Sequence, residues 1–194
     1  MFHVGAIMLG VFAAGLGMAG AASADPTFEA FRELCVNTRA EAPAALAAAD
    51  AQGWTDMPAM FVDEIAKAGF SGGEGRARNR NRVLYLMYAG QGAPMVEGAP
   101  MPVRACAVAA RPANAEAMRK AAADFAGVPA DPALPAQKGA AYAFTGEAGA
   151  HRQVTAAELS SPSGKDLIRR GRVSMLIVGG RPAAPLLVYA IPTL

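Results

Sequence analysis

Two cysteines, Cys35 and Cys106, are the residues whose chemistry says most about this chain. A zinc site needs about four ligands, and beyond the N-terminal segment the chain offers only these two and His151. A catalytic thiol needs a nearby histidine, which nothing in the sequence supplies. Lipidation needs a cysteine directly after an apolar leader, whereas Cys35 follows "FREL". We therefore predict a Cys35–Cys106 disulfide in an oxidising compartment, and no metal or cofactor.

The N-terminal segment is typical of an exported protein. No Asp, Glu, Lys or Arg precedes Asp25, and Val4–Gly20 is apolar or small throughout. Ala22-Ser23-Ala24 then matches the small-x-small pattern that signal peptidase recognises. We predict a cleavable signal peptide over 1–24, a single domain over 25–194, and a periplasmic or secreted location. An uncleaved signal anchor is the alternative; after cleavage we expect no transmembrane segment.

An alternating arginine run is the most unusual stretch of the chain. In an extended backbone, Arg76, Arg78, Arg80 and Arg82 lie on one face, where their guanidinium groups could bind an anionic ligand. The residues between them are alanine and asparagine, without aromatic rings for base stacking, and the formal net charge is only +2. We therefore do not expect nucleic acid as a partner. The alternative interpretation is a solvated edge strand or loop whose charges discourage edge-to-edge pairing.

His151 raises the possibility of hydrolase chemistry. It could act as the general base for a serine, the choices being Ser160, Ser161 and Ser163. The chain has no Gly-x-Ser-x-Gly elbow and lacks the βα alternation of an α/β-hydrolase. Our leading interpretation is a non-enzymatic exported protein that binds an unknown protein or small-molecule partner. An envelope hydrolase using His151 and an anion binder using the arginine run remain alternatives.

Apolar residues at helical spacing predict the helices that position these groups. Thr38 and Glu41 fit a capping box at the start of the second helix, and Asp56 is a plausible cap for the third. Ser160–Asp166 is expected to be a loop. The predicted helices cover about 26–35, 39–51, 56–68 and 112–126.

Short apolar runs predict strands over about 83–89, 103–110, 141–146 and 151–155, with two more over about 172–192. The glycine- and arginine-rich stretch 71–82 is interpreted as a loop or a poorly ordered strand entry. The order of elements indicates an α+β domain. We expect N-terminal helices packed on one face of a mainly antiparallel sheet of about four to six strands, ending in a β-hairpin.

A family resemblance rests on a short pattern. Phe31-x-x-x-Cys35-x-x-Thr38 is followed by Ala49-x-x-x-Gly53-Trp54 and then by a strand that carries Cys106 before a helix. This order resembles small exported proteins of proteobacteria that have no established activity. The resemblance covers the first two-thirds of the predicted mature chain. It implies export and paired cysteines, and it implies no activity.

Overall fold

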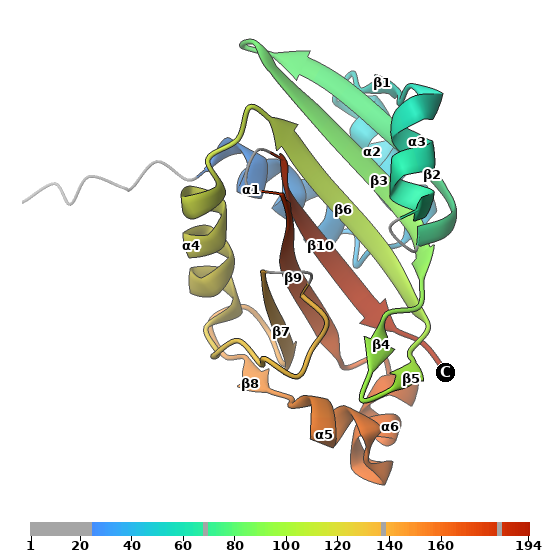
Figure 1. Cartoon of the computed structure of the whole chain (residues 1–194), viewed down its shortest axis with the longest axis vertical. Coiled ribbons are helices and arrows are strands. Elements are labelled where there is room, and N and C mark those ends of the chain that lie inside the picture. Colours follow the sequence, from blue (N-terminus) through green and yellow to red (C-terminus); the bar gives the residue numbers. More distant parts are fainter. Residues whose placement is uncertain (1–24, 68–69, 137–138, 182–183) are drawn as a thin grey trace, which may run out of the picture.

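The structure is a computed structural model that describes residues 25–67, 70–136, 139–181 and 184–194. Its central element is an antiparallel sheet (Figure 1). Its eight strands, in their order across the sheet, are β1 (Thr55–Asp56), β2 (Phe70–Arg80), β3 (Val83–Gly92), β6 (Val103–Arg111), β10 (Ala184–Pro192), β9 (Ser174–Arg181), β7 (Ala140–Thr145) and β8 (Arg152–Gln153). A separate two-stranded hairpin joins β4 (Met95–Val96) to β5 (Ala99–Pro100). The mixed α+β class is therefore confirmed.

The described residues form seven helical segments beside the sheet. They are α1 (Pro26–Phe31), the π-helical η1 (Arg32–Val36), α2 (Ala42–Ala51), α3 (Ala59–Lys67), α4 (Ala115–Ala126), α5 (Ala156–Ser160) and α6 (Pro162–Arg169). Among the described residues, none of these helices combines the length and the apolar character needed to cross a membrane. The predicted signal peptide lies outside the described residues.

Helices cover both faces of the sheet. The disulfide face is the face that carries Cys106, and residues of α1, η1, α2 and α4 pack on it in one buried cluster. On the opposite face, α3 packs on Ala77 and Leu86 of β2 and β3, while α5, α6 and β4 pack on the far strands. Figure 1 shows α3 in front of the sheet and α1 and α2 behind it. The expectation of helices on one face was therefore wrong.

The sheet has eight strands rather than the expected four to six, because Thr55–Asp56 forms β1 and the stretch interpreted as a loop or a poorly ordered strand entry is the long strand β2. Strand β2 pairs with β3 along its length, with a bulge between Ser71 and Glu74. Two glycines make room for a ring: a Cβ on Gly73 of β2 would lie 2.7 Å from the Tyr88 ring, and one on Gly90 of β3 would lie 2.9 Å from it. The Tyr88 ring therefore fills space that any side chain larger than that of glycine would occupy. Pairing with β3 stabilises β2 although its sequence lacks an apolar pattern.

The predicted capping box does not form. Arg39 and Ala40 have φ values of +53° and +55°, so the chain turns there and α2 begins only at Ala42. The Thr38 hydroxyl donates instead to the Leu34 carbonyl, at 2.6 Å. Glu41 ends up in an ion pair with Arg104 of β6 at 2.8 Å. These tertiary contacts replace the local cap.

Two further expectations need correction. Asp56 belongs to β1 rather than capping α3, and the stretch 160–166 is largely helical. Ser161 caps α6 by accepting a hydrogen bond from the Gly164 N–H at 3.1 Å. The predicted helix ending at Gly127, whose φ is +60°, is confirmed as α4. The pairing of β9 with β10 and that of β7 with β8 are confirmed as well.

Candidate functional site

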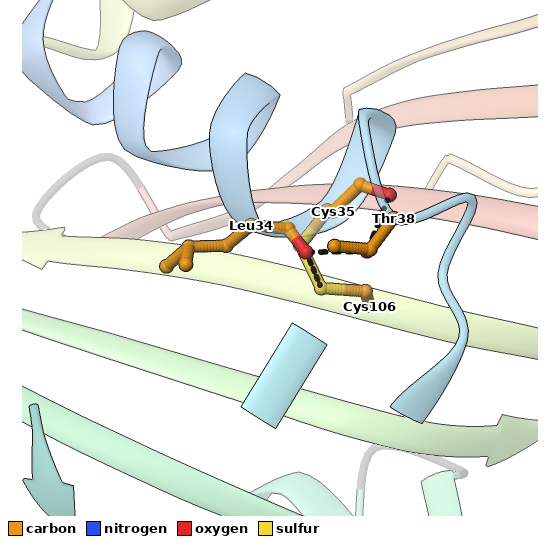
Figure 2. The surroundings of a disulfide bond; sticks show 4 residues. All are labelled: Leu34, Cys35, Thr38 and Cys106. Atoms are coloured by element: carbon orange, nitrogen blue, oxygen red, sulfur yellow. Dashed lines mark hydrogen bonds between the residues drawn. A yellow bond between two sulfur atoms is a disulfide. The ribbon is translucent and has the colours of Figure 1, made fainter. Parts of the chain in front are cut away.

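The disulfide links the N-terminal helical segment to the centre of the sheet. Cys35 of η1 is bonded to Cys106 of β6, both are fully buried, and their Cα atoms lie 5.2 Å apart. Figure 2 shows Cys106 Sγ beneath the Leu34 carbonyl oxygen at 3.7 Å, a packing contact because a disulfide sulfur carries no proton. The predicted pairing is confirmed. It is compatible with an oxidising, exported location.

The arginine run divides into three environments. Arg76, Arg78 and Arg80 lie opposite Met87, Tyr85 and Val83 of β3, respectively, so their side chains share the disulfide face of β2. Arg82 lies beyond the strand, in the hairpin turn, with a φ of +65°. The three strand arginines also differ in their partners.

Arg76 is held in a network of ion pairs. Its side chain is only 13% exposed, and its Nε donates to Asp50 at the end of α2 at 2.7 Å. Asp56 and Glu74 lie within 3.4 Å and 3.3 Å of its Nη1. The Asp50 hydrogen bond raises the pKa of Arg76 further above its usual value. The network ties α2 and β1 to β2, which is a structural role.

We expect Arg76→Gln to lower the free energy of unfolding by roughly 1 kcal/mol, because three carboxylates lose their common partner. Urea denaturation measures this, and Arg78→Gln, on the same strand face, is the matched control with a change within about 0.5 kcal/mol. Equal losses in both variants would contradict the structural role. Because the pKa of Arg76 is higher in the folded protein than in the unfolded chain, the ion pairs contribute their full stabilisation at any pH below the unfolded-state pKa. The stabilisation is lost only as the pH rises through the folded-state pKa. It is therefore constant around neutral pH.

Arg78 and Arg80 line a groove of about 390 Å³ on the disulfide face. Among the described residues, neither arginine has a hydrogen-bond or ion-pair partner. Tyr85 is the cross-strand neighbour of Arg78 and lines the same groove. The remaining lining residues come from α1, η1, the segment after α2 and the hairpin turn: Pro26, Glu29, Ala30, Glu33, Gln52, Trp54 and Asn81.

Trp54 forms part of the groove wall and carries an unsatisfied donor. The residue is 5% exposed, its ring meets Tyr85 edge-on at 6.3 Å, and its Nε1–H has no partner in the described part of the chain. A buried indole N–H usually finds an acceptor. No local pattern in the sequence connects Trp54 with the arginines.

His151 is a packed residue. Its ring stacks on Phe144 at 4.1 Å, meets Phe125 edge-on at 5.5 Å, and its Nδ1 lies 3.0 Å from the Ala126 carbonyl oxygen at the end of α4. The three serine hydroxyls serve local structure. Ser160 donates to the Ala156 carbonyl, Ser161 donates to the Glu158 carbonyl, and Ser163 bonds with Ser161. The structure therefore does not bring His151 together with these serines.

A second cavity, of about 220 Å³, lies on the opposite face of the sheet. Phe70, Met95, Ile177, Leu186 and Val188 contribute to its walls, and among the described residues that line it none has a charged or hydrogen-bonding side chain. Ligand sites usually combine apolar walls with a few polar groups that orient the ligand. The arginine groove meets that description, and this cavity does not.

The fold and the groove together define an α+β protein with a charged groove of small-ligand size. In the described ranges, no cluster of three or more His, Cys, Asp or Glu side chains could hold a metal ion. Comparisons with protein-family models, with curated proteins and with solved structures found no match to this chain. Any function must therefore be argued from the groove itself.

Proposed function

We propose that this chain is a non-enzymatic exported binding protein whose groove holds a small ligand that carries an anionic group. The observation that carries the proposal is the pair Arg78 and Arg80, which line the groove without an acidic partner in the described residues. Arginine guanidinium groups recognise carboxylates and phosphates through paired hydrogen bonds. Two such groups on alternate positions of one strand offer an anion several donors at once.

The size and the other walls of the groove also support a small ligand. Its volume of about 390 Å³ falls within the range of small-molecule sites. The half-buried Tyr85 offers ring surface to the body of a ligand, and the buried Trp54 packs against it in the same wall. The unpartnered Nε1–H of Trp54 is a donor that a small rearrangement could place on a ligand acceptor.

A non-enzymatic role agrees with the surroundings of His151. An imidazole that is stacked on Phe144 and engaged with the Ala126 carbonyl oxygen is poorly placed to take a proton from a serine. Among the described residues that line the groove there is no histidine or cysteine. Export remains an expectation, based on the N-terminal segment and supported by the disulfide.

The single tryptophan makes the proposal directly testable, because intrinsic fluorescence reports on Trp54 alone. Phenyl phosphate and benzoate combine an anion with a planar body, and benzyl alcohol is the neutral control. We expect saturable changes in Trp54 emission with the two anions only. The double variant Arg78→Gln/Arg80→Gln should weaken binding by about 100-fold or more, because each charged hydrogen bond contributes roughly 1.5–3 kcal/mol.

Arg119→Gln, on the exposed side of α4, is the matched control and should leave the affinity unchanged. Isothermal titration calorimetry checks that the fluorescence change reflects binding. If the double variant binds both anions as tightly as the wild type, the groove is not the anion site and the proposal fails.

A further inference from the structure

Opposite charges line the same groove without pairing across it. Glu29 and Glu33 are four residues apart along the N-terminal helical segment, and both line the groove that Arg78 and Arg80 enter from β2. In the described part of the chain, no ion pair of 4.0 Å or less joins either carboxylate to either arginine. The two walls therefore present separate charges to whatever occupies the space between them.

The two carboxylates differ in their local partners. Glu29 forms an ion pair with Arg32 at 2.7 Å, which balances its charge. Glu33 is exposed, and its one side-chain partner among the described residues is the neutral Gln52 amide, which donates a hydrogen bond to it at 3.3 Å. Glu33 is thus the uncompensated negative charge on the helical wall, opposite two uncompensated positive charges on the strand wall.

We infer that the ligand of this groove is zwitterionic, with its carboxylate on Arg78 and Arg80 and its ammonium group on Glu33. This inference rests on the proposed function and specifies the ligand class as free amino acids and short peptides. A zwitterion satisfies both walls at once, whereas a simple anion is repelled by Glu33 and a simple cation by the arginines. The aromatic residues Trp54 and Tyr85 would contact its side chains.

A dipeptide separates its two charges by more than the reach of a direct ion pair. An extended chain advances at most about 3.3–3.6 Å per residue, so the charged ends of a dipeptide are separated by a distance on the order of 7 Å. Such a ligand could therefore reach both the Glu33 carboxylate and the two arginines, which are too far apart to pair with each other directly. The groove volume of about 390 Å³ falls within the range of small-molecule sites.

Three probes with the same backbone isolate each charge. Alanyl-leucine carries both charges, N-acetyl-alanyl-leucine carries only the carboxylate, and alanyl-leucine amide carries only the ammonium group. We expect alanyl-leucine to bind at least about 10-fold more tightly than either blocked form, as measured by Trp54 fluorescence and calorimetry. Leucine and alanyl-alanyl-leucine test which separation of the charges fits best.

Variants assign each charge to its wall. Glu33→Gln should weaken alanyl-leucine about 10-fold and leave the N-acetyl form unchanged or slightly tighter. Arg78→Gln/Arg80→Gln should abolish binding of both carboxylate-bearing probes. Glu147→Gln, which changes an exposed carboxylate outside the groove, is the matched control and should alter neither affinity.

The outcomes separate this inference from the proposed function. If the N-acetyl form binds as tightly as alanyl-leucine and depends on the arginines, the zwitterion inference is overturned and the anion site stands. If the amide binds as tightly as alanyl-leucine, or if binding survives loss of both arginines, both are overturned. Absence of binding by leucine, alanyl-leucine and alanyl-alanyl-leucine, while phenyl phosphate binds, also overturns the inference.

Discussion

Replacing both cysteines, as Cys35→Ala/Cys106→Ala, should lower the free energy of unfolding by about 4 kcal/mol. The disulfide closes a sequence separation of 71 residues, and opening it returns the corresponding loop entropy to the unfolded chain. A loss of this size is comparable with the whole stability of many small domains. Urea denaturation in non-reducing buffer, followed by circular dichroism, measures it.

Reductant supplies the control for this prediction. Dithiothreitol should destabilise the wild type by a similar amount and should leave the double variant unchanged, because that variant has no disulfide to reduce. Alanine is preferred to serine because both positions are fully buried and a hydroxyl there would need a partner. A loss below about 1 kcal/mol would show that the link contributes little to the folded state.

Phe31→Ala should cost about 3–5 kcal/mol, the usual range when a buried phenylalanine is truncated. Phe31 is fully buried, and its ring meets Phe28 at 5.7 Å and Tyr189 of β10 at 6.5 Å. It therefore anchors α1 to the sheet, next to the disulfide. Truncation leaves a cavity where the helical segment meets the sheet.

Phe31→Leu retains much of the volume, so it should cost about half as much or less. The same denaturation experiment compares the two variants. Because Glu29 of α1 and Trp54 both line the groove, Trp54 emission shows whether loss of the Phe31 ring also changes the groove. Similar small effects from both substitutions would mean that Phe31 is not an anchor of α1.

Much of the fold was predictable wherever local pattern and tertiary structure agree. The helix α4 has an apolar stripe, an Asn114 cap and a terminal Gly127, so its local signals suffice. The paired strands β9 and β10 are continuous apolar runs. Strand β2 lacks such a pattern, because glycines accommodate the Tyr88 ring and arginines face the groove. It was therefore interpreted as a loop or a poorly ordered strand entry.

The candidate site was only partly predictable. Alternation in the sequence correctly placed the strand arginines on one face, because side chains in a strand alternate with a period of two. It did not distinguish Arg76, which Asp50 holds in an ion pair, from Arg78 and Arg80, which have no partner among the described residues. Partners from a distant helix made that distinction.

Sequence alone determined the disulfide pairing, because the chain has only two cysteines, and it determined the α+β class and the common face of the strand arginines through residue type and local spacing. The tertiary structure alone decided that helices lie on both faces of the sheet, and that Trp54, Glu33 and Arg78 meet at one groove. The physical reason is register: the pairing of β2 with β1 and β3, and the packing of η1 on β6, set these neighbours. No short stretch of sequence contains that information.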